Sequence, residues 1–109
     1  MIVITHTPGE IRIEGHAGYD VIGRDIVCAA VSVLTETFIE GVRKLTPDEL
    51  KCEIAAGKVV IQYGNLSTEA QLLMSSFFVG VGMVANSYPA NVKLIAPAVD
   101  GVKSYGMTE

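Results

Sequence analysis

A cysteine and a histidine twelve residues apart, Cys28 and His16, are the side chains in this sequence best suited to covalent chemistry. A cysteine thiolate is a strong nucleophile, and an imidazole beside it can remove the thiol proton and later protonate a leaving group. The segment between them contains Gly18 and Gly23 and leads directly to Cys28. Such a segment can fold back as a loop, so we expect the imidazole and the thiol to form a Cys/His pair.

The remaining cysteine and histidine lack this arrangement. Cys52 lies in an expected strand with no histidine nearby in sequence, and a free cysteine in an apolar segment is most often a small core residue. The same structural interpretation applies to Cys28 or to His16 when each is considered alone. His6 follows the first expected strand and is interpreted as a surface residue. It is the combination of His16, the glycine-bearing segment and Cys28 that favours chemistry.

Local signals predict the elements that must position this pair. Asp25 is a good N-cap residue, and the apolar periodicity that follows it predicts a long helix. The expected elements are strands at 2–5 and 11–15, a loop at 17–24, a helix at 26–45, a hairpin of strands at 51–55 and 58–63, a second helix from 67 to about 88, and a last strand at 91–96. This order predicts an α+β fold, a two-layer sandwich of a mixed or antiparallel sheet of about five strands with two helices on one face.

The start of the first helix should influence the thiol. If Asp25 is the N-cap, Cys28 is the third helical residue, where unpaired backbone N–H groups and the helix dipole favour a thiolate. The Asp25 carboxylate opposes this effect unless the cap N–H groups or Arg24 take up its charge, and the sequence leaves that balance open. Backbone N–H groups at 26–28 are also candidates for an oxyanion hole.

A helical wheel places Cys28 at the edge of the core. At roughly 100° per residue, one stripe of the helix forms the expected core face. That stripe consists of Val27, Ala30, Val31, Leu34, Phe38, Val42 and Leu45. Cys28 lies on the neighbouring stripe with Ser32, Thr35 and Ile39. Ser32 either bonds a substrate carbonyl or the thiol region, or bonds back to the carbonyl four residues earlier.

The composition argues against several other classes of function. The 109 residues fit one domain, which we expect to span 1–109, and the net charge of −4 with no Lys/Arg cluster argues against nucleic-acid binding. The longest apolar run, 77–85, is too short for a membrane span, and the N-terminus lacks a signal-peptide pattern. Two cysteines and two histidines lack the paired spacing of a zinc site. We expect a cytoplasmic protein with reduced thiols that uses no metal or cofactor.

The second helix is apolar around most of its circumference. Between Leu72 and Ala85 it carries no charged residue. A two-layer fold of this size buries only one side of a helix, so the other side needs a cover. A homodimer interface and burial under the C-terminal tail both remain open.

The sequence around the pair resembles the signature of the ribosomal-processing cysteine protease family, Prp. The segments Gly15-His16-Ala17, Gly23 and Asp25-Ile26-Val27-Cys28-Ala29-Ala30-Val31-Ser32 carry the resemblance, and the helix end Asn86-Ser87-Tyr88-Pro89 is also similar. The resemblance implies a small α+β domain that forms homodimers, with Cys28 as nucleophile and His16 as base. It implies supporting positions for Asp25 and Ser32. It also implies a substrate loop that moves on binding, which includes Ala17, Gly18, Tyr19 and Gly23.

The expected activity is therefore endopeptidase cleavage by acyl transfer through Cys28. The resemblance implies a protein substrate, the N-terminal extension of a bacterial large-subunit ribosomal protein, cut after an apolar segment with paired phenylalanines. Relatives from phages or mobile elements that cut capsid or other proteins share the signature. A non-catalytic assembly factor that grips an apolar peptide and, more weakly, a redox sensor at Cys28 are the alternatives. We expect His16 and Cys28 to stay apart until substrate arrives.

Overall fold

The strands and helices follow one another along the chain in the order ββαββαβ. In the computed structural model, which describes residues 1–21 and 23–96, the elements are β1 (Ile2–Thr7), β2 (Glu10–Glu14), α1 (Ile26–Leu45), β3 (Lys51–Ala55), β4 (Lys58–Gln62), α2 (Thr68–Ser87) and β5 (Val92–Ile95). The strands form one sheet in the order β3-β4-β2-β1-β5. Only β1 and β5 pair in parallel, and the other neighbours are antiparallel.

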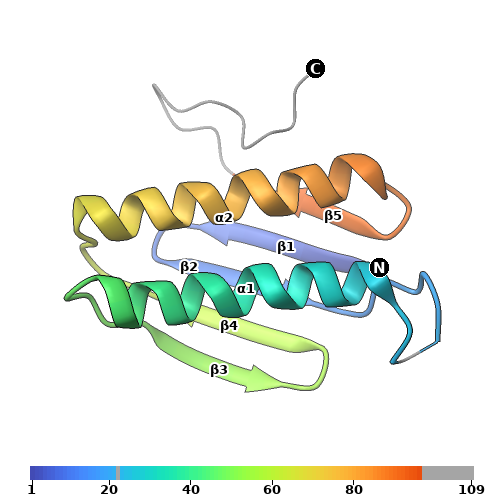
Figure 1. Cartoon of the computed structure of the whole chain (residues 1–109), viewed down its shortest axis with the longest axis horizontal. Coiled ribbons are helices and arrows are strands. Elements are labelled where there is room, and N and C mark those ends of the chain that lie inside the picture. The colour runs from blue at the N-terminus through green and yellow to red at the C-terminus, as the bar shows by residue number, and fades with distance from the viewer. Residues whose placement is uncertain (22, 97–109) are drawn as a thin grey trace.

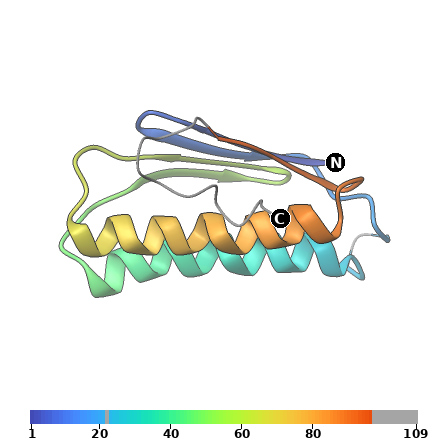
Figure 2. The same ribbon diagram turned by 90° about the horizontal axis from the view of Figure 1, so that it is seen from above.

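Both helices lie side by side on the same face of this sheet (Figure 2). Viewed through the helices, α2 lies nearer β1 and β5 and α1 nearer β4 (Figure 1). The hairpin β3–β4 therefore forms one flank of the sheet beside α1, with β3 as its edge strand. The predicted two-layer α+β fold with a five-stranded mixed sheet is confirmed.

The core lies between the sheet and the two helices. Alternate residues of the central strands are buried, because successive side chains of a strand point to opposite faces. The helices contribute Val27, Val31, Thr35, Phe38, Ile39 and Val42 from α1, and Ala70, Phe77, Phe78, Val81, Gly82 and Ala85 from α2. Gly80 allows the helices to pack closely, since a Cβ atom there would lie 2.8 Å from the Leu34 side chain.

The predicted bounds of α1 are correct, but part of its predicted core face is wrong. Leu45 is 72% exposed, whereas Thr35 and Ile39, expected on the neighbouring stripe, are buried. The buried stripe of α1 is thus rotated toward the stripe of Cys28. Cys28 itself is partly buried and packs against the core, as the wheel predicted.

The interpretation of His6 as a surface residue is wrong. β1 continues to Thr7, so that His6 lies within the strand, on the face that is turned to the core. Its side chain is only 7% exposed. The ring stacks on Phe78 at 4.5 Å between centroids, and Nε2 lies 2.7 Å from the hydroxyl oxygen of Tyr63. Burial lowers the pKa of His6 below its usual value. Both partners are more than fifty residues away along the chain, so no local pattern indicates this environment.

The outer side of α2 is apolar and exposed. Leu72, Val79 and Met83 are 70%, 45% and 60% exposed. By length and composition α2 could also cross a membrane, a property that core helices of soluble proteins share, and here its inner side is packed in the core. The prediction that the C-terminal tail covers α2 concerns residues outside the described ranges.

Candidate active site

Cys28 occupies the first turn of α1, as predicted. Asp25 is the N-cap, and its carboxylate accepts hydrogen bonds from the backbone N–H groups of Val27 and Cys28. An N-cap of this kind satisfies donors that have no partner within the helix. Cys28 is therefore the N3 residue, held at the helix start by a local signal that is visible in the sequence.

Asp25 also ties the preceding loop to the helix. Its Oδ1 accepts from Val27 N at 3.0 Å and Cys28 N at 2.9 Å, while its Oδ2 accepts from Tyr19 N at 2.9 Å and Asp20 N at 3.3 Å. Burial acts to raise the pKa of the Asp25 carboxyl, but these four N–H donors outweigh it and hold that pKa below its usual range. Backbone N–H groups therefore take up the charge of the Asp25 carboxylate, a balance that the sequence had left open.

The backbone of Ala17 contacts the thiol directly. Ala17 N donates to Cys28 Sγ at 3.2 Å, and Ala17 is only 2% exposed. Because the Ala17 nitrogen is bonded to the carbonyl carbon of His16, standard backbone dimensions place the His16 Cα within about 6 Å of the sulfur. The loop therefore folds back from the end of β2 and brings His16 beside Cys28.

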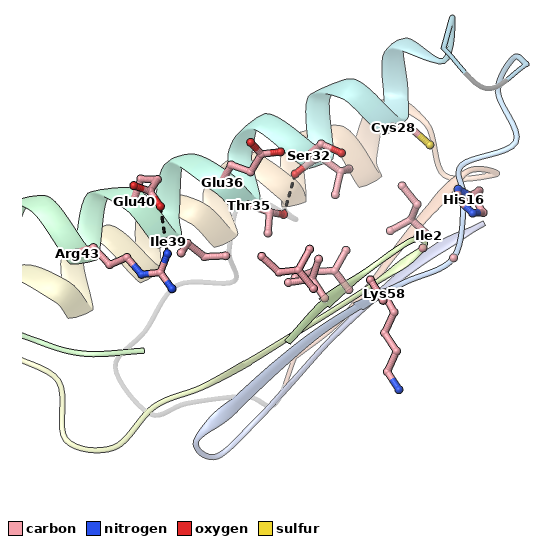
Figure 3. Close-up of a pocket in the computed structure, with 17 residues that line it drawn as sticks. Ile2, His16, Cys28, Ser32, Thr35, Glu36, Ile39, Glu40, Arg43 and Lys58 are labelled. Carbon is pink, nitrogen blue, oxygen red and sulfur yellow. Dashed lines mark hydrogen bonds and ion pairs between the residues drawn. The ribbon is translucent and has the colours of Figure 1, made fainter. Parts of the chain in front are cut away.

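The His16 side chain is exposed and lies against the β3–β4 turn. A Cβ atom on Gly57 would lie 3.0 Å from His16 Nε2, so the ring rests on the bare backbone of that glycine. Figure 3 shows the Cys28 sulfur pointing toward the side on which His16 lies. Among residues 1–21 and 23–96, no hydrogen bond joins the imidazole to the thiol.

Two cavities meet at these residues, and both are lined by His16, Cys28 and Ser32. The first, of about 560 Å³, runs along α1 from Cys28 to Arg43 and is bounded on its other side by the β3–β4 hairpin (Figure 3). The second, of about 510 Å³, lies under the loop and includes Gly18, Asp20, Val21, Gly23 and Asp25. A chain laid through both cavities would pass the thiol.

The first cavity is mainly apolar. Its apolar lining consists of Ile2, Ile13, Val31, Ile39, Ile54 and Val59. Charged side chains also line it, namely Glu36, Glu40 and Arg43 from α1 and Lys58 from β4, and Arg43 pairs with Glu40 at 3.2 Å. Pockets that bind hydrophobic ligands combine such an apolar lining with polar groups that orient the ligand.

The hydroxyl of Ser32 is available at the site, whereas two of the N–H groups at the helix start are already bonded. Ser32 is exposed and lines both cavities, and within the described part of the chain its hydroxyl makes no bond back to the Cys28 carbonyl. Thr35 makes such a bond instead, to the Val31 carbonyl at 2.8 Å. The expectation of an oxyanion hole at 26–28 is wrong for Val27 and Cys28 in this conformation, because Asp25 occupies both N–H groups.

The loop predicted before α1 lies between β2 and α1, and its role in substrate binding stays a prediction. Gly18 and Gly23 have φ angles of +68° and +91°, a conformation that favours glycine. The Tyr19 ring packs edge-on against Tyr88 at 5.3 Å between centroids. The loop is thus attached to the body of the protein through Ala17, Tyr19 and Asp25.

Two positions in the site were not anticipated from the sequence. Gly57, with a φ angle of +71°, supports the imidazole, and its carbonyl accepts a 2.8 Å hydrogen bond from Gly15 N that ties the hairpin to the end of β2. Asn91 donates through Nδ2 to the Ala17 carbonyl at 2.9 Å. The sequence indicated Gly57 only as a residue of the hairpin turn. No pattern in the sequence indicated a role for Asn91.

Metal chemistry has no ligand set in the part of the chain that the structure describes. There, no group of three or more His, Cys, Asp or Glu side chains is placed to hold an ion. The chemistry available at this site is that of a thiol, an imidazole and backbone N–H donors.

The fold and the site together define a small two-layer α+β protein with a helix-start thiol beside a loop histidine. Residues 2–93 match the sequence profile of the family described as Cysteine protease Prp. The chain belongs to this family.

Solved structures share the fold. The S. aureus ribosomal processing protease Prp with a covalently linked product peptide matches with a TM-score of 0.80 and 23% identity, over 88% of this chain and 97% of that one. The same protease with a substrate peptide gives a TM-score of 0.74 at 22% identity, over the same shares. A Streptococcus mutans protein gives 0.63 at 26% identity, over 88% of this chain and 93% of that one. A search of curated proteins found no match.

Proposed function

We propose that this protein is a cytoplasmic cysteine endopeptidase in which Cys28 is the nucleophile and His16 the general base. The hydrogen bond from Ala17 N to Cys28 Sγ is the observation that carries the proposal. This bond directs a backbone donor at the sulfur, where it stabilises a thiolate. Because His16 directly precedes Ala17 in the chain, the same bond holds His16 close to Cys28. Membership of a cysteine protease family supports the same assignment.

The reaction follows from these positions. The His16 ring leaves its place on Gly57 by side-chain rotation and accepts the Cys28 proton. The thiolate attacks the peptide carbonyl carbon, and the negative charge moves to the carbonyl oxygen. Ala17 N–H adjoins the sulfur and is the proposed donor to that oxygen once the sulfur has bonded to carbon. His16 then protonates the leaving amine, and water hydrolyses the thioester to release the acid and the free thiol.

The substrate is proposed to be an extended apolar peptide. The cavity along α1 reaches from Cys28 to Arg43, a helix length of about 22 Å, which matches about six to seven residues of extended chain. Its apolar lining suits aromatic side chains such as paired phenylalanines. The S. aureus relative was solved with substrate and product peptides, which supports the N-terminal extension of a ribosomal protein as the substrate.

We also propose that the protein acts as a homodimer. The exposed apolar side chains of α2, Leu72, Val79 and Met83, lie on the side of the helix that the core leaves uncovered. Association of two copies through this surface would remove it from water.

The test is incubation with a synthetic peptide that carries an apolar ribosomal-protein extension with paired phenylalanines, followed by mass measurement. We expect one internal cut with the wild type and with Cys52→Ala, and none with Cys28→Ala. Cleavage that persists in Cys28→Ala would overturn the mechanism. Binding without cleavage would favour a peptide-binding assembly factor. Cleavage of phage capsid peptides alone would assign the substrate to the phage-type relatives.

A further inference from the structure

Asn91 is distant from Cys28 in sequence, but its side chain reaches the loop that contacts the thiol. Nδ2 of Asn91 donates to the carbonyl oxygen of Ala17 at 2.9 Å. The N–H group of the same Ala17 donates to Cys28 Sγ at 3.2 Å. Ala17 is therefore held through its carbonyl while its N–H group is directed at the sulfur.

The backbone of Asn91 is fixed by two regular elements. Its N–H group donates to the Tyr88 carbonyl at the end of α2 at 2.9 Å, and its carbonyl accepts from Ile2 N at the start of β1 at 2.8 Å. A series of hydrogen bonds thus runs from the frame of the sheet and α2 through Asn91 and Ala17 to the Cys28 sulfur. The side-chain amide is the link between the frame and the loop.

Asn91 adds an attachment for the loop at Ala17, beside the one that Asp25 makes through the N–H groups of Tyr19 and Asp20. Gly18 and Gly23 are exposed, and a Cβ atom at either would meet nothing within 4 Å. Ala17, by contrast, is buried, and a buried carbonyl without a partner would be costly. Asn is suited to this position because its amide nitrogen is a donor, whereas a carboxylate of the same shape only accepts.

We propose that Asn91 is a positioning residue of this site. It holds the Ala17 peptide so that its N–H group addresses Cys28 Sγ and so that His16 stays within reach of the thiol. Asn91 lines neither cavity, so it acts on the thiol and not on the bound peptide. The kinetic part of this inference rests on the proposed function, but the effect on the thiol does not.

The test compares Asn91→Asp with Asn65→Asp, both in a Cys52→Ala background. Asn65 is exposed in the segment before α2 and provides the matched control. The first readout is the rate of Cys28 alkylation by iodoacetamide, which needs no substrate. We expect the Asn91→Asp rate at neutral pH to fall about tenfold, as for a charge-assisted hydrogen bond that loses its alignment. The deficit relative to the control should shrink toward pH 4, where a protonated carboxyl regains a donor.

The second readout is peptide cleavage, where kcat should fall about tenfold with KM within about twofold, since the peptide cavities are untouched. Equal alkylation rates for the two aspartate variants would overturn the inference. If circular dichroism shows that Asn91→Asp is unfolded, Asn91→Ser removes the amide donor with less disturbance and is judged by the same rates. A wild type that cleaves no peptide, while Asn91→Asp still slows alkylation, would refute the peptidase proposal and leave the role of Asn91 supported.

Discussion

The two cysteines lie near opposite ends of α1 and differ in what surrounds their sulfur atoms. Cys28, in the first turn, receives a hydrogen bond from Ala17 N and lines both cavities. Cys52, on β3, packs against the core. Burial raises the pKa of the Cys52 thiol, and the charge of Arg43, in the last turn of α1, offsets this only in part. Cys28 thus has a backbone donor at its sulfur and borders two cavities, whereas the Cys52 thiol is packed against the core.

The two histidines show the same contrast. His16 is exposed at the junction of the cavities and rests on a glycine. His6 points from β1 toward α2, where its ring stacks on Phe78, and Nε2 is hydrogen-bonded to the Tyr63 hydroxyl. A ring that can rotate is suited to proton transfer, whereas a ring that is packed on its face contributes to stability. The comparison therefore separates a reactive region from a structural one, and each of the following experiments tests that separation.

The largest effect should come from replacing the two histidines in turn. His16→Ala should lower the rate of peptide cleavage by about 10²- to 10⁴-fold, the usual contribution of a general base, with little change in melting temperature. His6→Ala should leave the rate per folded molecule near that of the wild type but lower the free energy of unfolding by about 2 kcal/mol. Kinetic assays and urea unfolding measure the two effects. The opposite pattern would show that the histidine roles are reversed.

Alkylation of the cysteines should differ by more than about tenfold at neutral pH, because thiolate stabilisation controls reactivity. Cys28 in Cys52→Ala is expected to react fast, and Cys52 in Cys28→Ala slowly. The Cys52 rate should rise only above the ordinary thiol pKa of 9.0, since burial raises its pKa. The rates can be followed by mass spectrometry across pH. Equal rates would mean that the surroundings of Cys28 do not activate it.

Gly57→Ala tests the support beneath His16. Its φ angle of +71° and a Cβ contact of 3.0 Å with His16 Nε2 make any side chain unfavourable there. We expect the free energy of unfolding to fall by about 1 kcal/mol, and the NMR signals of the His16 ring to shift while those of His6 do not. Gly64→Ala is the control, because a Cβ atom at Gly64 would meet nothing within 4 Å. Unchanged His16 signals in Gly57→Ala would contradict the observed ring position.

The smallest effect concerns stability in acid. The pKa of His6 is lowered by burial, and backbone N–H groups hold the pKa of Asp25 low. For both groups the unfolded chain takes up a proton first, so stability is lost as pH falls. The loss linked to His6 should begin below its ordinary pKa of 6.5, and the loss linked to Asp25 below 3.8. Urea unfolding at a series of pH values should show both stages. His6→Gln should remove the first stage alone, and its persistence would assign that stage to another group.

Elements with strong local signals could be predicted from the sequence. The Asp25 N-cap and the apolar period that follows it determine the start of α1, and hence the position of Cys28 in its first turn. The hairpin around Gly57 follows from turn chemistry and from the strands on either side. These features depend on residues a few positions apart, whose conformational preferences do not require the rest of the fold.

Contacts between distant segments could not be predicted in this way. The burial of His6 depends on Tyr63 and Phe78, and the orientation of Ala17 depends on Asn91. The charge of Asp25 is taken up partly by the N–H groups of Tyr19 and Asp20 in the loop. These two contacts form only when the loop is folded, so they could not be predicted from the sequence either.

The sequence alone therefore determined the order of the elements, the two-layer class and the place of Cys28 at a helix start. The tertiary structure decided which histidine is buried, which N–H groups remain available at the site and what holds the loop against the thiol. The physical reason is that caps, turns and periodicity act within one or two turns of chain. Burial and hydrogen-bond partners, in contrast, depend on which strands and helices become neighbours.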